Sequence, residues 1–103
     1  MARRTLTNSR RAYLCTYDVV EDKARTKLFE LLKDHGEHVQ YSVFLCALTR
    51  VEVTRLSSIA RSIINEAQDQ LLLVDVGPDH VDWTAQLSCI GKTWTPLVRS
   101  RIV

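Results

Sequence analysis

The 103-residue sequence has few residues that interrupt regular structure, with only three glycines and two prolines. No hydrophobic run approaches the roughly 20 residues of a membrane-spanning helix, and the basic N-terminus lacks the apolar core of a signal peptide. No internal repeat or low-complexity segment is present. These absences argue against membrane and secreted proteins, and we expect a cytoplasmic protein of one domain spanning residues 1–103.

Cysteine chemistry is also sparse. Cys15, Cys46 and Cys89 are far apart and odd in number, and no C-x-x-C pair occurs. The pattern gives no support to a zinc or dithiol redox motif. Buried free thiols in a reducing compartment fit it best.

The net charge of +2 says little about partners, but its distribution says more. Arginines gather at the two ends of the chain: Arg3, Arg4, Arg10, Arg11, Arg99 and Arg101. One interpretation of the basic tail 1–11 is a solvated terminus. The other is an arm that contacts phosphates, with Arg10 and Arg11 nearest the folded part.

The first apolar run, 12–18, ends abruptly in the carboxylate of Asp18. Neither face of the run is strongly polar before this residue, which predicts a central strand covered on both sides. Asp18 then lies where the strand leaves the sheet, a usual place for ligands in open sheets. The alternative is a carboxylate that only caps the following turn.

The remaining periodicity predicts five further elements. They are a helix over 22–35 ended by Gly36, one long strand over 37–48 bent near Ser42, a helix over 50–67, a strand over 70–76 and a last strand over 94–103. Thr49 and Glu52 have the spacing of a capping box at the start of the second helix. The order predicts an α+β sandwich, with two helices on one face of an antiparallel sheet. Because the strands are apolar on both faces, we expect a second copy of the chain to cover the other face.

Cations occupy the start of the first predicted helix, at Lys23, Arg25 and Lys27. Positive charge there opposes the helix dipole, and the neighbouring acidic residues would offset this. The alternative is that an anion such as phosphate binds at this helix start. The sequence leaves the two interpretations open.

Two strings, at this separation, resemble a known family. They are Tyr-Leu-Cys-Thr-Tyr-Asp at 13–18 and Val-Gln-Tyr-Ser-Val-Phe at 39–44. The segment Cys-Ile-Gly-Lys at 89–92 adds a weaker likeness. The pattern is similar to the small CRISPR adaptation proteins called "Cas-two", which act beside the "Cas-one" integrase.

This resemblance implies a ferredoxin-like βαββαβ fold, in which 37–48 divides into two strands, and a twofold homodimer packed through its open sheet faces. It also implies an extra C-terminal strand within 89–103 that joins the partner's sheet. Asp18 matches the family's metal-binding aspartate, which implies a Mg²⁺ (or Mn²⁺) ion held between two copies. The family positions around that site are occupied here by Tyr17, Arg25, Ser42 and Phe44, although Tyr17 and Phe44 would equally suit a plain core.

The function that follows is CRISPR spacer acquisition. The protein would bind duplex DNA beside the integrase, and as a metal-dependent endonuclease it would hydrolyse phosphodiester bonds in RNA or DNA. Phosphate contacts would come from Lys23, Arg25, Lys27, Arg10 and Arg11. Lys27 and His38 replace arginines of some members, which disfavours bidentate phosphate binding. The alternatives are a toxin-like ribonuclease of the same fold and a ferredoxin-like homodimer that binds a small ligand.

Overall fold

The computed structural model describes residues 9–79 and 87–94. Its elements are β1 (Arg11–Asp18), α2 (Asp22–Lys33), β2 (Gly36–Gln40), β3 (Val43–Leu48), α3 (Arg50–Ile63) and β4 (Gln70–Pro78). The strands form one antiparallel sheet in the order β2-β3-β1-β4. This connectivity confirms the predicted ferredoxin-like βαββαβ fold.

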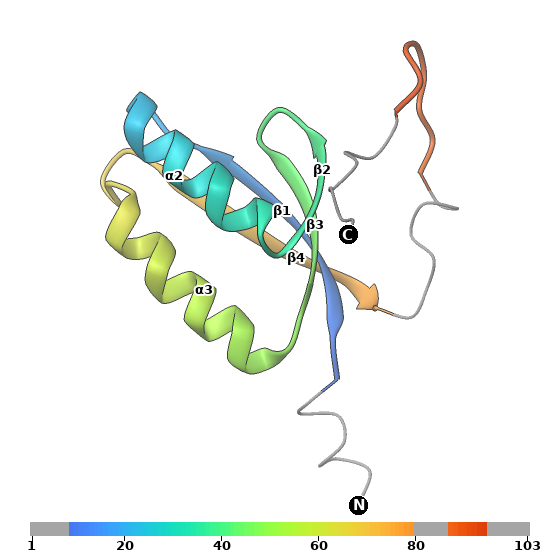
Figure 1. The fold of residues 1–103 in the computed structure, drawn as a ribbon, viewed down its shortest axis with the longest axis horizontal. Helices are drawn as coiled ribbons and strands as arrows, with labels where there is room; N and C mark the ends of the chain where they lie inside the picture. The colour runs from blue at the N-terminus through green and yellow to red at the C-terminus, as the bar shows by residue number, and fades with distance from the viewer. Residues whose placement is uncertain (1–8, 80–86, 95–103) are drawn as a thin grey trace, which may run out of the picture.

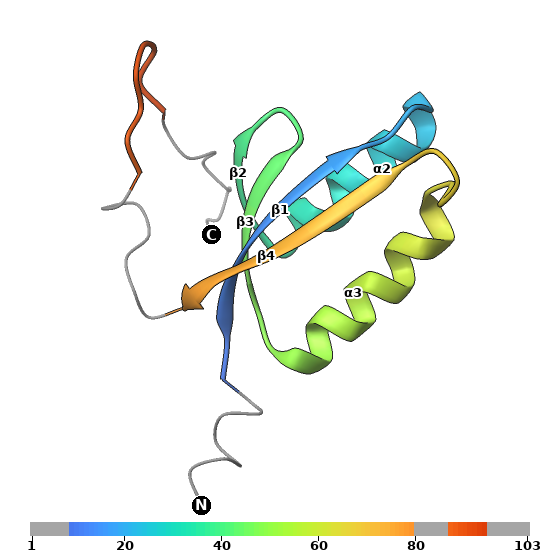
Figure 2. The same ribbon diagram turned by 180° about the vertical axis from the view of Figure 1, so that it is seen from behind.

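Both helices lie on the same face of the sheet (Figures 1 and 2). The core lies between these layers and contains residues from both central strands and both helices: Cys15, Tyr17, Val19, Ala24, Leu28, Leu32, Phe44, Cys46, Leu48, Leu56 and Ala60. The helices contribute apolar residues at spacings of three and four, so each presents one stripe to the sheet. The end of β1 is therefore held in a rigid, two-layered frame.

The opposite face of the sheet carries apolar side chains that no described helix covers. In β4 the partly buried Leu71 and Leu73 pack on the core, so the alternating Leu72, Val74 and Val76 point the other way. These three side chains are 45–51% exposed. Leu14 of β1 pairs with Val74 on one side and with Leu45 on the other, so an apolar row crosses the sheet. We refer to the face containing Leu14, Leu72, Val74 and Val76 as the open face.

The region 37–48 is a hairpin, so the prediction of a single strand from local pattern is wrong, and the two strands implied by the family resemblance are confirmed. The turn falls at Tyr41 and Ser42, where Tyr41 adopts a positive φ of 22°. A sequence without Gly, Pro or Asn gives no local signal for such a turn. Antiparallel pairing of β2 with β3 decides it instead.

Gly36 does not end α2, which is a second difference from the sequence-based prediction. The helix is capped earlier by Asp34, and Gly36 is the first residue of β2. A Cβ atom at Gly36 would lie 2.2 Å from the carbonyl oxygen of Leu45. The glycine therefore allows the close approach of β2 to β3, rather than a helix cap.

The second helix is also shorter than predicted, because α3 ends at Ile63. Its start agrees with the sequence: Thr49 Oγ1 accepts a 3.2 Å hydrogen bond from the Glu52 N–H, and Glu52 Oε1 accepts one of 3.0 Å from the Thr49 N–H. In contrast, β4 runs past Gly77 to Pro78. A proline is tolerated there because β4 is an edge strand.

The ends of the chain differ from the predicted tails. Arg11 belongs to β1, so the boundary of the predicted tail 1–11 is wrong at its inner end. Residues 89–94 form no strand, and the rest of the predicted C-terminal strand, with Arg99 and Arg101, lies outside the described residues, as do Arg3 and Arg4. Neither α2 nor α3, in the part of the chain that is described, has the length and apolar character needed to span a bilayer.

Two of the three cysteines are buried free thiols, as predicted. Cys15 and Cys46 lie in the core, whereas Cys89 is exposed. Contact with Cys15, together with burial, raises the pKa of the Cys46 thiol well above its usual range. Cys46 therefore stays protonated and acts as a small apolar residue.

Candidate functional site

Asp18 is the last residue of β1 and is exposed. The neighbouring Tyr17 packs in the core, so alternation places Asp18 with Leu14 at the edge of the open face. Its backbone pairs with Gln70 at the start of β4. Its carboxylate makes no hydrogen bond or ion pair with any residue of 9–79 or 87–94, so within this part of the chain both oxygens are available to a ligand.

The loops around Asp18 are fixed by a second carboxylate, Asp69, which the sequence analysis missed. Asp69 is only 9% exposed. Its Oδ1 accepts a 3.0 Å hydrogen bond from the N–H of Val20, and its Oδ2 accepts one of 2.8 Å from the N–H of Asn65. Asp69 thus joins the loop after β1 to the loop before β4. The only local signal was an Asn and an Asp four residues apart after a helix, which is typical of many turns.

Arg25 also stabilises the loop after β1, at the same end of the sheet as Asp69. One of its guanidinium nitrogens donates to the carbonyl oxygen of Val19 at 2.8 Å and to that of Val20 at 3.3 Å, and the other pairs with Asp22. The Arg25 side chain is still 43% exposed. It orders the β1–α2 loop and keeps part of its charge facing solvent.

A hollow of about 440 Å³ opens beside Arg25. It is lined by Tyr17, Arg25, Thr26, Phe29, His38, Tyr41 and Ser42, from β1, α2, β2 and the β2–β3 turn. Burial raises the pKa of the Tyr17 hydroxyl, and the nearby Arg25 charge opposes this rise only partly. The phenol therefore stays neutral at physiological pH. The fold brings three of the predicted site residues, Tyr17, Arg25 and Ser42, together here.

Phe44 lies beneath this hollow rather than in it. It is fully buried, and its ring centroid is 5.3 Å from that of Phe29 and 4.9 Å from that of His38. Phe29 and His38 are also in contact, edge to face, at 5.2 Å. Phe44 is a core residue that supports the two rings above it.

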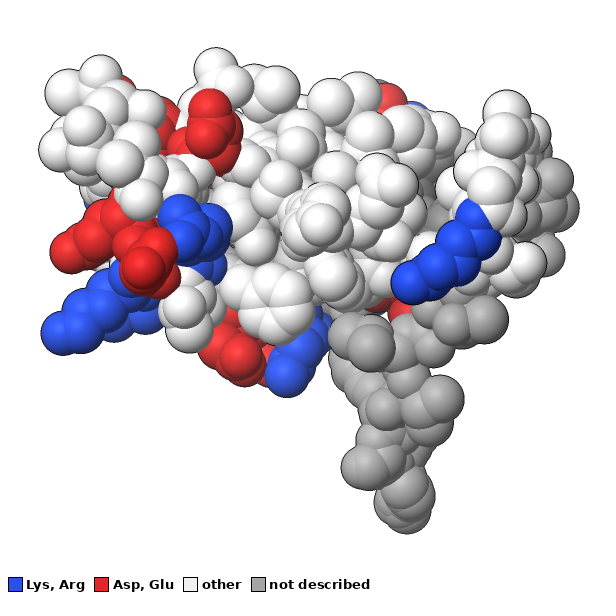
Figure 3. All heavy atoms as spheres, turned by 90° about the horizontal axis from the view of Figure 1, so that it is seen from above, with Lys and Arg blue, Asp and Glu red and all other residues white. Residues whose placement is uncertain are grey.

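Lys23 and Lys27 lie on the exposed side of α2, where they line a shallow hollow of about 390 Å³ with Asp22 and Thr26. Thr26 borders both this hollow and the one containing Tyr17. Charged side chains gather toward the end of the molecule where α2 begins, and the middle of the same view is uncharged (Figure 3). Acidic and basic side chains are mixed at this end, and we refer to Lys23 and Lys27, which lie next to the aromatic hollow and share theirs with Asp22, as the basic shoulder.

Arg10 and Arg11 are not free solvated arms, so that interpretation of the tail is wrong for both. Arg10 pairs with Glu52 and donates to the carbonyl oxygen of Ala47 at 3.1 Å, and Arg11 Nε lies 2.8 Å from Asp75 Oδ2. The arginine lowers the pKa of Asp75, and Asp75 raises that of Arg11. Both arginines lie toward the other end of β1 from Asp18. Their contact with phosphate stays a prediction, and a phosphate that bound them would have to compete with Glu52 or Asp75.

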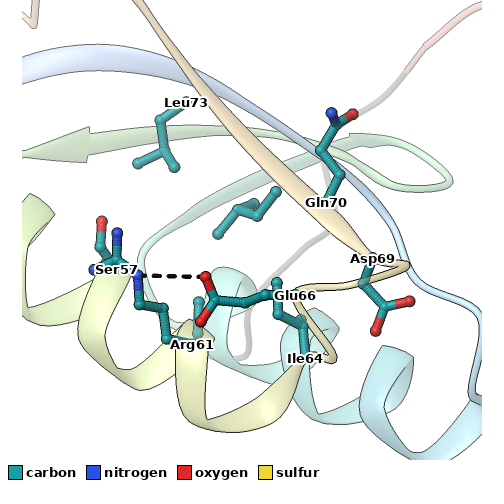
Figure 4. A pocket seen from close by; sticks show the side chains of 9 residues that line it. Ser57, Arg61, Ile64, Glu66, Asp69, Gln70 and Leu73 are labelled. Carbon is teal, nitrogen blue, oxygen red and sulfur yellow. Dashed lines mark ion pairs between the residues drawn. The ribbon is translucent and has the colours of Figure 1, made fainter.

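A further hollow of about 260 Å³ lies between α3 and β4 (Figure 4). Arg61 and Glu66 face each other across it at 3.9 Å. Asp69 also borders the hollow, but its two oxygens already accept backbone hydrogen bonds. This hollow therefore shows no charged group directed at a ligand.

A divalent ion needs more oxygen ligands than Asp18 alone supplies. Among residues 9–79 and 87–94, no group of three or more His, Cys, Asp or Glu side chains converges. Mg²⁺ is commonly held by one or two carboxylates, with water and substrate phosphate completing the shell. Within the described residues Asp18 would supply one carboxylate to such a site, and a second copy of the chain that brought its own Asp18 nearby would supply another.

Comparison with known proteins agrees with this geometry. Residues 11–82 match the family described as "CRISPR associated protein Cas2". The chain belongs to the Cas2 family. A Cas2 relative from Geobacter sulfurreducens, named a CRISPR-associated endoribonuclease, is 31% identical over 88% of this chain and 95% of its own length. One from Rhodospirillum rubrum with the same kind of name is 31% identical over 93% of each chain.

Solved structures give the same result. Cas2 from Streptococcus pyogenes superposes with a TM-score of 0.68 and 28% identity, over 78% of this chain and 99% of that chain. A hypothetical protein from Thermus thermophilus superposes with a TM-score of 0.70 and 33% identity, over 85% of this chain and 99% of that chain. The Cas2 fold of this chain is thus shared over nearly the full length of both relatives.

Proposed function

We propose that this Cas2 chain is a homodimeric, cytoplasmic nucleic-acid-binding protein that acts in CRISPR spacer acquisition beside the integrase and hydrolyses phosphodiester bonds with Mg²⁺. The observation that carries the proposal is the placement of Asp18. It is an exposed carboxylate with both oxygens available among the described residues, at the edge of the open face. A group placed in this way is suited to a ligand that arrives when the face is covered.

The homodimer follows from the open face. Leu72, Val74 and Val76 expose about half of their surface, which is unfavourable for a row of neighbouring apolar side chains. A twofold pairing of two open faces would bury this row against its own copy. It would also bring the two Asp18 residues toward the same side of the interface.

The two Asp18 carboxylates would then hold one Mg²⁺ (or Mn²⁺) ion. When bound, the ion would polarise a phosphodiester and favour attack by water. Asp18 would hold the ion, Asp69 and Arg25 hold the loop after β1 in place, and Tyr17, buried on the opposite face of β1, anchors the strand end that carries Asp18. Lys23 and Lys27 would attract the phosphate backbone without reading sequence.

DNA capture does not require hydrolysis. The basic shoulder of Lys23 and Lys27 lies on α2, outside the open face, and would remain accessible in the dimer. A dimer would present two such shoulders, one on each side, along a duplex. This arrangement supports holding a DNA fragment for the integrase whether or not Asp18 is active.

The test compares Asp18→Asn with the parent protein in Mg²⁺-dependent cleavage of RNA and DNA. We expect cleavage to fall by about a hundredfold or more, with unchanged thermal stability because the Asp18 side chain is exposed. Asp34→Asn, another exposed aspartate at the end of α2, is the matched control and should cut normally. Equal cleavage by the parent and Asp18→Asn would remove Asp18 from the chemistry.

The role in acquisition is tested separately by mixing the protein with its integrase and duplex DNA. We expect a ternary complex at low salt that weakens as salt rises. Lys23→Ala combined with Lys27→Ala should weaken it, whereas Asp18→Asn should not. Absence of any ternary complex at low salt would reject DNA capture.

A further inference from the structure

We infer that the hollow between α2 and the β2–β3 turn is a binding site for an unpaired nucleobase, with Tyr41 as the stacking residue. This inference rests on the proposed nucleic-acid binding and names a contact within it. The site is separate from Asp18, and none of the residues lining it carries a carboxylate.

The first observation is the exposure of Tyr41. Its side chain is 92% exposed, the highest exposed fraction of any described aromatic residue. Its backbone has a φ of 22°, in a region that glycine and asparagine adopt more readily than an aromatic residue. The position therefore costs both backbone strain and exposed apolar area, and backbone strain of this kind is concentrated at functional sites.

The second observation is that side-chain and backbone hydrogen bonds from β2 and β1 hold this turn. His38 Nε2 lies 2.7 Å from the Tyr41 carbonyl oxygen, so that nitrogen carries its hydrogen and donates it. The next carbonyl, that of Ser42, accepts a 3.1 Å hydrogen bond from the Tyr17 N–H. His38 is itself packed between Phe29 and Phe44. The Tyr41 backbone is thus ordered before any ligand binds, although its ring faces solvent.

The third observation is the chemistry of the hollow. Its lining combines aromatic rings with the Arg25 guanidinium and the hydroxyls of Thr26 and Ser42. The volume of about 440 Å³ falls in the range of roughly 300–1,000 Å³ typical of small-ligand sites. Aromatic and guanidinium planes stack on bases of any sequence, which is how many proteins bind single strands.

The adjoining basic shoulder offers positive charge for the phosphate of a nucleotide whose base lies in the hollow. Because Thr26 lines both hollows, a base placed beside Tyr41 would have its phosphate directed toward Lys23 and Lys27. This combination of ring and cations is complementary to a nucleotide rather than to an uncharged aromatic ligand. The occupant is therefore an unpaired nucleotide within a strand, such as one at an overhang or a frayed duplex end.

The test uses a single-stranded oligonucleotide that contains one 2-aminopurine, whose fluorescence is quenched by stacking. Binding is measured in EDTA, since the hollow uses no metal ion. We expect Tyr41→Ala to weaken single-strand affinity by about tenfold and to abolish the quenching, whereas Tyr41→Phe retains both. Val51→Ala, a 58% exposed residue on α3, is the matched control and should bind as the parent does.

The Tyr41→Gly variant distinguishes a loss of base binding from a loss of folding. Glycine relieves the positive φ, so we expect this variant to melt no lower than the parent while losing the quenching. An unchanged affinity and quenching in Tyr41→Ala, or equal affinity for a strand with an abasic site at the probe position, would overturn the base site. If duplex binding still depended on Lys23 and Lys27, the proposed function would stand. A parent protein that bound neither single strands nor duplex would overturn both.

Discussion

The backbone N–H of Tyr17 donates a 3.1 Å hydrogen bond to the carbonyl oxygen of Ser42. This bond joins the end of β1 to the β2–β3 turn, 25 residues later in the chain. It brings the turn next to α2 and closes one side of the aromatic hollow. Asp18, one residue further along, is left at the edge of the open face.

The first prediction concerns assembly. Leu72→Glu places a charge in the exposed apolar row of β4, where a dimer would bury it. Because an unpaired buried charge is strongly unfavourable, we expect the parent to sediment as a dimer and the variant as a monomer. Val51→Glu, on α3 and away from the open face, should remain dimeric. A parent protein that sediments as a monomer would reject the shared-metal proposal.

Asp69 is predicted to contribute more to the stability of the fold than the exposed Asp79. Asp69→Ala leaves the N–H groups of Val20 and Asn65 without their acceptor, so we expect a loss of about 2–3 kcal/mol in the free energy of unfolding. Chemical denaturation measures this. Asp79→Ala, at an exposed aspartate whose side chain bonds to no described residue, should change stability by less than about 0.5 kcal/mol. Equal effects would show that Asp69 does not fix the two loops.

Gly36→Ala is predicted to disrupt the β2–β3 pairing. The new Cβ would lie 2.2 Å from the Leu45 carbonyl oxygen and 2.6 Å from the Cys46 Cα, both of them backbone atoms that cannot rotate away. We expect a loss of about 3 kcal/mol or more, seen as a lower melting temperature. Gly77→Ala meets no atom within 4 Å and should cost only about 1–2 kcal/mol, through its positive φ.

Glu52 is predicted to give a pH-dependent contribution to stability. The Thr49 N–H, and then Arg10, lower the pKa of this carboxyl below its usual 4.5. A carboxyl with a lowered folded pKa stabilises the protein above its unfolded pKa, and this is lost as pH falls through the folded pKa. Glu52→Gln should therefore be less stable than the parent at pH 7, by less than about 1 kcal/mol.

The difference between the parent and Glu52→Gln should shrink as the pH falls below 4.5. Thermal melts of both proteins from pH 7 to pH 3 measure it. Gln40→Ala, at the exposed end of β2, is the control, because it changes no ionisable group and should show no such trend. A constant difference across this range would mean that Glu52 acts through packing alone.

Much of the fold could be predicted from local pattern. The run ending at Asp18 and the apolar stripes of α2 and α3 indicated their elements, and Thr49 with Glu52 placed the start of α3. The hairpin of β2 and β3 could not be predicted locally, because no turn-forming residue marks Tyr41 and Ser42. The family resemblance was needed to expect it.

The residues of the candidate site also differ in how far local sequence pattern could indicate them. The abrupt end of an apolar run was enough to place Asp18 at the end of the first strand, and its role in binding a metal stays a prediction. Asp69 could not be identified, because its importance depends on the N–H of Val20, 49 residues earlier. Tyr41 could not be identified as a candidate binding residue from the sequence either. Its place beside Arg25 depends on a strand far away in the sequence, because the Tyr17 N–H of β1 donates to the carbonyl oxygen of Ser42, the residue after Tyr41.

By itself, the sequence determined β1, β4 and the two helices, and the carboxylate at the end of the first strand, since alternation, helical periodicity and capping act over a few residues. Only the tertiary structure decided where 37–48 turns, why Gly36 is a glycine, and which face of the sheet the two described helices cover. These depend on backbone groups and side chains that meet across the sheet, and such distances do not exist until the strands pair.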